Sequence, residues 1–244
     1  MGGSSVAKAD TLALGFNAFV FNDFTAPYCD VEGSVAVGGN MTVSSYSVGD
    51  KRTDPTATGG NSLVVAGQLS YQWGRVYHGN VVVGQNYVQD GYDLAPGYQI
   101  YQNVNPLPVD FAAQEAALKA LSAQLAGLAP TGTVAKPWST VDLIGDYTSE
   151  YQVFDIDGSL LVPGSSNLKL LTASIPSDAT VILNISGTSG LLSGGIDGFE
   201  AIRDRVIFNF YEATTLDITG VGVQGSILAP YATVTGGSGV VWGQ

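Results

Sequence analysis

The sequence predicts an all-β protein, a right-handed parallel β-helix (solenoid) with one long α-helix packed along its side. The main observation is a recurring phrase in which a Gly, Asn or Gln turn leads into three or four apolar residues and another turn. Runs this short and this rich in β-branched residues form strands, and loosely repeated units bury their apolar sides by stacking as rungs. The phrase occupies residues 33–40, 61–68, 79–86, 158–164, 225–230 and 239–244. The right hand follows from the preference of parallel crossovers.

The helix is predicted within residues 110–129, a segment almost without β-branched residues. Asp110 can cap its first turn, and Gly127 with Pro130 stops it. Four leucines at spacings of three and four form one apolar stripe: Leu118, Leu121, Leu125 and Leu128. This stripe needs a partner surface, either the side of the solenoid or another helix.

The other elements follow in order along the chain. Residues 10–24 form an apolar cap over the first open rung, as a helix started by Asp10 or as a strand. Strands fill residues 30–104, a linker covers 131–150, and strands resume at 151. Two later runs are expected to be buried on both faces; they contain Asn184 and Asn209, which we expect to bond to backbone or to stack on a neighbour.

Length and charge restrict the possible functions. A chain of 244 residues fits one domain, 1–244, in which 1–5 is interpreted as an expression scar. The net charge of −12, with only nine Lys and Arg, argues against binding to nucleic acid or to an anionic membrane surface. The sequence has no run of 18 apolar residues, so it predicts no membrane span.

The residues that could carry chemistry are few. His78 is the single His, and no nucleophile motif accompanies it. Cys29 is the single Cys; we expect a small buried apolar residue, with a thioester to a Gln as the alternative. Asp155, Asp157 and Asp197 are acidic but lack the full calcium-loop pattern, so no metal or cofactor is expected.

A cluster of aromatic residues is the best candidate for ligand binding. Tyr71, Trp73 and Tyr77 lie in a stretch that holds half of the tyrosines. Because rings bury large area at low entropy cost, these three are the predicted ligand-binding residues. The alternative is that the rings stack along the side of the solenoid or under the helix.

Two other functions are weighed against this one. Glycan cleavage needs paired carboxylates, and Asp155 with Asp157 would share one face of a strand. Ice binding needs a flat threonine ladder. The sequence has Thr-x-Thr pairs at 56–58, 131–133 and 233–235, but two of them fall in expected loops, and the rungs carry Val, Leu and Ala.

Five ordered motifs resemble the choice-of-anchor A domain family: residues 14–24, 30–40, 181–187, 207–212 and 225–232. The resemblance implies a bacterial surface or secreted protein with a C-terminal anchor signal, which is absent from this sequence. The Phe-rich start, the inserted helix and the closing Gly-Ser-Ile-Leu-Ala of residues 225–229 are also similar, more faintly, to the β-solenoid ice-binding fold.

The sequence therefore predicts a non-catalytic extracellular module of a bacterial surface protein, used in adhesion, ligand binding or display. Its expected partner is a glycan or a protein on a host, a matrix or a neighbouring cell. The first alternative is an ice-binding module, and the second is a glycan-active β-helix enzyme.

Overall fold

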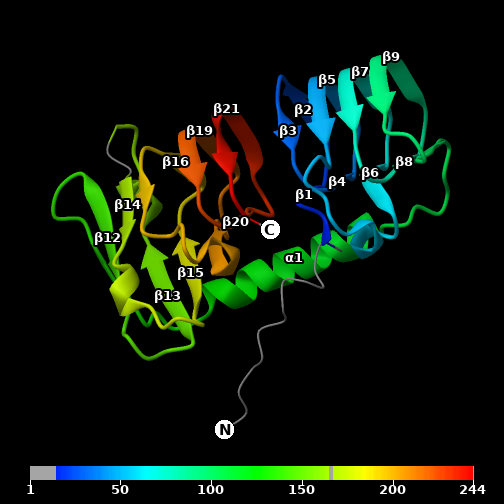
Figure 1. Ribbon diagram of the computed structural model, residues 1–244. Coiled ribbons are helices and arrows are strands. Elements are labelled where there is room, and N and C mark those ends of the chain that lie inside the picture. The colour runs from blue at the N-terminus through cyan, green and yellow to red at the C-terminus, as the bar shows by residue number, and fades with distance from the viewer. Residues whose placement is uncertain (1–14, 165–166, 244) are drawn as a thin grey trace, which may run out of the picture. The chain divides into compact units, whose positions relative to one another are not determined.

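The computed structural model describes residues 15–164 and 167–243. These residues form two compact units, one ending at Ala117 and the other beginning at Leu118 (Figure 1). The predictions for residues 1–5 and for Asp10 lie outside the described residues.

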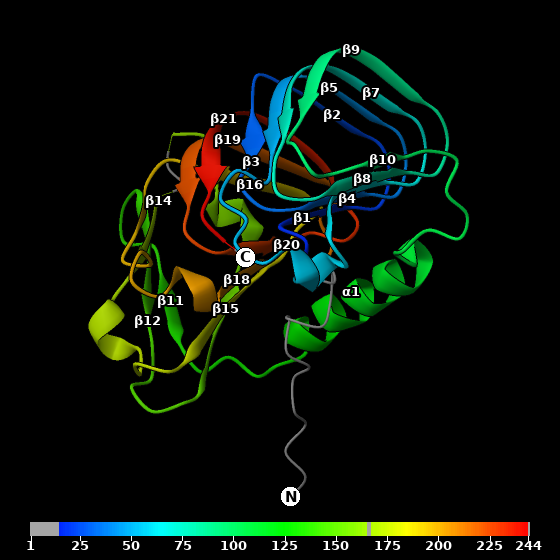
Figure 2. The same ribbon diagram turned by 45° about the vertical axis from the view of Figure 1, so that its right-hand side comes forward.

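The first unit contains two sheets, and the chain passes from one to the other in turn. The strands of the first sheet, in spatial order, are β1 (Ala18–Val20), β4 (Val35–Val37), β6 (Asn61–Val65), β8 (Asn80–Val83) and β10 (Ile100–Tyr101). Those of the second are β2 (Phe24–Pro27), β5 (Met41–Val48), β7 (Leu69–Val76) and β9 (Tyr87–Leu94), with β3 (Asp30–Val31) also paired to β5. All of these pairs are parallel, as expected, and Figure 2 shows the strands of each sheet side by side.

The core of this unit is made by the β-branched runs that the recurring phrase supplies. Every residue of β4 and β6 is buried. On β5 and β7 most buried residues alternate with partly exposed or exposed ones, so these strands present one side to the core and the other to solvent. The strands β5 and β7 of the second sheet therefore carry side chains that face solvent.

The second unit contains three sheets, visited in turn. The first consists of β11 (Thr133–Ala135), β12 (Thr140–Ile144), β14 (Asn167–Leu170) and β17 (Ile196–Asp197). The next consists of β13 (Tyr151–Ile156), β15 (Thr180–Ile185), β18 (Val206–Asn209) and β20 (Ser226–Leu228). The last consists of β16 (Ser189–Ser193), β19 (Thr215–Val223) and β21 (Thr233–Val241). β11 pairs antiparallel to β12, and the other pairs in these sheets are parallel.

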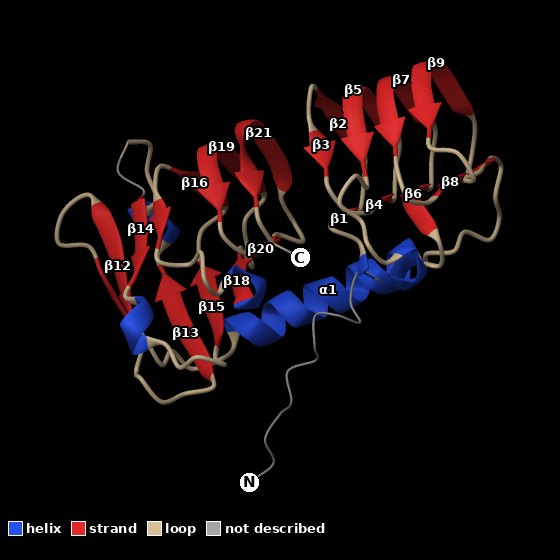
Figure 3. Ribbon diagram, in the orientation of Figure 1, coloured by secondary structure: helices blue, strands red, loops and turns tan. Residues whose placement is uncertain are grey.

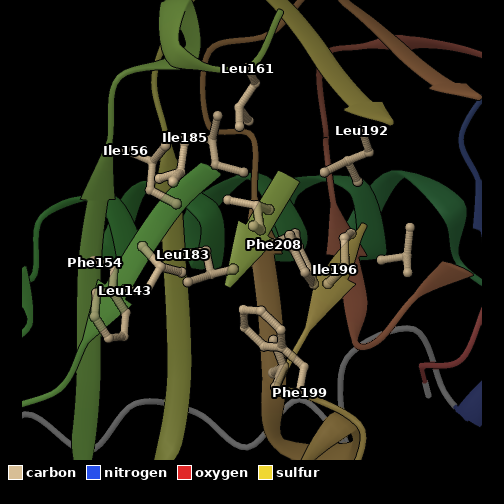
Figure 4. Close-up of a cluster of buried hydrophobic side chains, with 14 of the residues drawn as sticks. Leu143, Phe154, Ile156, Leu161, Leu183, Ile185, Leu192, Ile196, Phe199 and Phe208 are labelled. Carbon is tan, nitrogen blue, oxygen red and sulfur yellow. The ribbon is translucent and has the colours of Figure 1, made fainter. Parts of the chain in front are cut away.

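Stacked apolar side chains fill the interior of this unit (Figure 4). Phe154, Leu183 and Phe208 occupy matching positions on neighbouring strands β13, β15 and β18, and all three are fully buried. Each strand thus covers the apolar side of the next, which is why rungs of this kind cannot fold singly.

The described residues contain one α-helix, α1 (Phe111–Ala126; Figure 3). Its start agrees with the sequence, because the backbone N–H of Ala113 donates to Oδ1 of Asp110 at 3.0 Å. Leu121 and Leu125 of the predicted stripe are buried, whereas Leu128 lies beyond the helix. Short 3-10 turns occur at Pro55–Thr58, Gly158–Leu160, Thr172–Ser174 and Arg203–Arg205.

Two asparagines attach α1 to the second unit. Nδ2 of Asn209 donates to the carbonyl of Ser122 at 3.0 Å, and Nδ2 of Asn184 donates to the carbonyl of Leu125 at 2.8 Å. This confirms the expectation that both side chains bond to backbone or to a neighbour. Packing of α1 against the side of a parallel sheet is confirmed here as well.

The predicted mostly-β composition, with parallel sheets and one long helix, is confirmed. One prediction about the chain course is wrong: residues 131–150 are not a simple linker, because they contain β11 and β12. Val141 and Leu143 of β12 are buried in the core, so the scattered apolar residues of this segment already mark a half-buried strand.

Candidate ligand-binding surface

A column of left-handed backbone conformations crosses the second sheet of the first unit. Tyr28, Ser45, Trp73 and Gly91 have φ values of 55°, 49°, 54° and 70°. The register of the strands places each of these residues beside the next, from the end of β2 across β5 and β7 to β9. Positive φ is costly for residues other than Gly. Its repetition at the same position of successive strands therefore indicates a regular change of direction in the sheet.

This column carries two exposed aromatic side chains. Tyr28 is 81% exposed and Trp73 is 52% exposed, while Ser45 between them is partly buried. The indole of Trp73 lies over Gly91, where an added Cβ would come within 2.4 Å of the ring. Gly91 therefore makes room for the indole and supports it against the backbone of β9.

An open depression of about 490 Å³ lies beside the column. It is lined by aromatic, hydroxyl and acidic side chains: Tyr28, Cys29, Asp30, Ser45, Ser47, Asp50 and Tyr77. Such a lining offers rings for stacking and many oxygen atoms for hydrogen bonds.

The carboxylate of Asp50 lines this depression and forms an ion pair. Its Oδ2 lies 3.3 Å from Nζ of Lys51, and its hydrogen bond raises the pKa of that ammonium group. Oδ1 of Asp50 is buried and finds no hydrogen-bond partner among the described residues.

The loop that carries Asp50 is fixed against the turn that carries Tyr77. Nη1 of Arg52 donates to Oγ of Ser62 at 2.9 Å and to the carbonyl of His78 at 3.1 Å. Burial lowers the pKa of Arg52, but the group stays charged at any physiological pH. These bonds order both sides of the depression before any ligand arrives.

The structure does not place the three predicted binding residues on one face. Tyr71 is only 1% exposed, and its hydroxyl donates to the carbonyl of Tyr46 at 2.7 Å. Its position on β7 faces the core, so the expectation that Tyr71 lies on a surface is wrong. Trp73 is exposed on the left-handed column, and Tyr77 lines the depression with the guanidinium of Arg75 5.1 Å from its ring centroid. Tyr28, which was not predicted from the sequence, is the third aromatic residue of the candidate binding surface.

Cys29 is also placed differently from the expectation. It is exposed rather than buried, and it lines the depression. No Gln is among the lining residues, so nothing in this region supports a thioester. Burial raises the pKa of the Tyr46 phenol, and the charges of Cys29 and Asp30 reinforce this effect, so the phenol stays neutral.

The paired carboxylates considered for glycan cleavage do line a common depression, in the second unit. It measures about 330 Å³ and is lined by Ala126, Asp155, Ile156, Asp157, Asn184, Ser186 and Tyr211. However, Oδ1 of Asp157 accepts from the backbone N–H of Ser159 at 2.9 Å, and bonds from Ser159 lower its pKa. A general acid needs a raised pKa, so Asp157 is poorly suited to that role.

Hydroxyl side chains form columns on the last sheet of the second unit. In each column the residues come from β16, β19 and β21 in register: Ser189, Thr215 and Thr233 in one, and Ser193, Thr219 and Ser238 in another. All of them are exposed except Ser193, which is partly buried. Val, Leu and Ala were expected on the rungs, and these columns were not predicted, because one hydroxyl per strand forms a recognisable array only after the strands are paired.

Within the described part of the chain, no group of three or more His, Cys, Asp or Glu side chains could hold a metal ion. No helix among the described residues is long and apolar enough to cross a membrane.

The fold and these surfaces define a mostly-β module whose sheets present aromatic and hydroxyl side chains to solvent. Over residues 9–244 the chain matches the family described as "Putative Ice-binding-like adhesive domain", and it belongs to that family. Comparisons with curated proteins and with solved structures gave no match. The family agrees with the ice-binding-like and adhesive parts of the expectation, and it does not support the resemblance to the choice-of-anchor A domain.

Proposed function

We propose that this chain is a non-catalytic adhesive module that binds its ligand at the depression beside Tyr28 and Tyr77. The observation that carries the proposal is the exposed pair Tyr28 and Trp73, held on a repeated left-handed corner next to a polar depression. Exposed aromatic anchors beside hydrogen-bonding groups are typical of recognition surfaces. Membership in an adhesive family is consistent with this use.

The first experiment is a binding screen of the purified chain against a glycan array and matrix proteins. We expect a saturable partner whose binding is lost in the double variant Trp73→Ala, Tyr77→Ala. Trp138→Ala is the matched control, since Trp138 is 88% exposed but lies in the second unit. Tyr71 is left intact because its buried side chain belongs to the core. Binding that survives the double substitution in a folded protein would refute the assignment.

The proposal includes a cell-surface or extracellular location. The partner is a glycan or protein on a host, a matrix or a neighbouring cell. Labelling of intact native cells with an antibody against this chain tests the location. Signal that appears only after the cells are permeabilised contradicts it.

The chain is proposed to act without catalysis or a cofactor. The lowered pKa of Asp157 supports this proposal, because it makes this carboxyl poorly suited to act as the general acid of glycan cleavage. Incubation with a panel of polysaccharides and an assay for new reducing ends provides the test. Cleavage that is abolished by Asp155→Asn would favour the glycan-active enzyme instead.

Within each unit, we infer that the strands wind as a right-handed solenoid. The support is that the chain returns repeatedly to the same parallel sheets, together with the strong right-handed preference of parallel crossovers. An experimentally determined structure decides the matter, and a left-handed crossover in it would exclude this winding.

A second candidate function is ice binding, favoured by the hydroxyl columns on β16, β19 and β21. Neighbouring strands set the members of a column about 4.8 Å apart, so the array is regular in one direction. An ice-shaping assay compares the unmodified chain with Thr219→Tyr. Thr148→Tyr is the control, because Thr148 is exposed and lies in the loop between β12 and β13, outside the sheets. Ice shaping lost only in Thr219→Tyr would favour this function, and absence of shaping in the unmodified chain would end it.

A further inference from the structure

We propose that the adhesive ligand is an extended, uncharged β-linked polysaccharide that runs across the strands of the second sheet of the first unit. Tyr28 and Trp73 would stack on alternate sugars of this chain. The inference rests on the proposed adhesive function and names the chemical class of its ligand.

Spacing is the first argument. Tyr28 and Trp73 occupy the same column and are separated by the single strand that carries Ser45. Two strand spacings place their backbones about 10 Å apart. In an extended β-1,4-linked glycan every second sugar presents the same face, and the repeat of two sugars has a similar length. A small residue between the two rings leaves room for the intervening sugar.

The neighbouring side chains supply what sugar hydroxyls need. Asp30, Ser47 and Asp50 line the depression beside the column. Carboxylates and hydroxyls accept from the paired hydroxyls of a sugar ring, while the aromatic faces contact its C–H surface. Stacking and hydrogen bonding are therefore available side by side.

Charge selects among glycans. The chain carries a net charge of −12, and two carboxylates line the depression. An acidic polysaccharide would bring further negative charge to these groups and be repelled. A neutral glycan escapes this cost and still uses the carboxylates as acceptors.

The backbone at both aromatic positions is held in the same conformation. Tyr28 and Trp73 both have positive φ, and the backbone N–H of Tyr28 donates to the carbonyl of Ser44 at 2.9 Å. The indole of Trp73 also packs over Gly91. An indole supported in this way loses little further freedom on binding, which favours affinity for a rigid, extended ligand.

The test measures binding of the full chain to β-1,4-linked glucose oligomers from two to six sugars by titration calorimetry, with α-1,4-linked oligomers of the same lengths as the comparison. We expect affinity for the β-linked series to rise steeply once the oligomer can span both rings. Tyr28→Ala and Trp73→Ala should each weaken binding of the hexamer by about tenfold or more. Trp138→Ala should have no effect, and Trp73→Tyr should retain most of the affinity because it keeps a ring.

The outcomes separate this inference from the proposed function. Binding of a protein partner that depends on Trp73, with no binding of any glucose oligomer, would overturn the glycan assignment and leave the adhesive site in place. Equal binding of α- and β-linked oligomers, or no dependence on length, would overturn the extended geometry. Hexamer binding that is unchanged in Tyr28→Ala and Trp73→Ala would place the glycan elsewhere and refute this site.

Discussion

Asn209 donates a hydrogen bond from Nδ2 to Oδ1 of Asn184, 2.9 Å away on the neighbouring parallel strand. Both amides also reach α1: each bonds a helix carbonyl, and Oγ of Ser122 donates to Oδ1 of Asn209 at 2.6 Å. All three side chains are buried. A buried polar network of this kind stabilises the fold only when each polar group has a hydrogen-bond partner. Removing one side chain leaves its partners without a hydrogen bond.

We expect Asn209→Ala to lower the free energy of unfolding by about 1–3 kcal/mol. The substitution removes the acceptor of the Ser122 hydroxyl and the donor to Oδ1 of Asn184. Urea unfolding monitored by circular dichroism measures the change. Asn86→Ala, at an exposed position, is the control and should stay within about 0.5 kcal/mol. A double-mutant cycle with Ser122→Ala should show coupling between the two sites. An effect of Asn209→Ala no larger than that of the control would contradict the network.

Gly74→Ala should be strongly destabilising. Gly74 has a φ of 110°, and an added Cβ would lie 1.9 Å from the carbonyl oxygen of Tyr46, which cannot move without breaking the ladder. We expect a loss of more than about 2 kcal/mol in the free energy of unfolding. Gly220→Ala is the matched control, since Gly220 also has a positive φ, of 62°, but has open space around it. The difference between the two variants measures the steric clash together with the greater backbone strain at φ 110°.

The expectation of a single domain remains a prediction, and unfolding can test it. Helix α1 begins at Phe111, which packs on an apolar cluster of the first unit, and it reaches Leu125, which is buried in the second. We therefore expect one cooperative transition. Leu63→Ala and Phe208→Ala, each in the core of one unit, should both shift that transition, by about 2–5 kcal/mol. Two transitions, each moved by one variant only, would show two domains.

The carboxylate of Asp146 should make stability depend on pH. It accepts hydrogen bonds from the backbone N–H groups of Thr148 and Ser149 and from Nε2 of Gln152, and bonds from these residues, those of Ser149 first, lower its pKa. A lowered pKa in the folded state stabilises the protein above the ordinary value of 3.8, and this contribution is lost as the pH falls further.

Thermal unfolding of the unmodified chain and of Asp146→Asn, measured from neutral pH down to about pH 3, tests this prediction. The variant should have a lower Tm at neutral pH, because it lacks the charge that these donors stabilise. The gap between the two proteins should narrow below about pH 4. A gap that is constant across the range would show that titration of Asp146 makes no contribution.

The candidate site illustrates which kind of information the sequence lacked. Trp73 and Tyr77 were identified from aromatic density alone, and both are at least partly exposed. Tyr71, two residues before Trp73, faces the core, and the left-handed conformation at Trp73 interrupts the simple alternation that would put both on one face. Tyr28 and Asp50 are remote in sequence from that cluster and were not identified. Their nearness to Tyr77 follows from strand register and from the bonds of Arg52.

The sequence by itself determined most elements of this protein, although β11 and β12 were not predicted. Short β-branched runs between turn residues specify strands, and Asp110 with the leucine stripe specifies α1, because these signals are local to the chain. Only the tertiary structure decided which side chains lie together. The columns Tyr28–Ser45–Trp73–Gly91 and Ser189–Thr215–Thr233 join residues from successive strands. The pairing register that aligns them is a non-local property, since a shift of one residue would turn every side chain of a strand to its other face.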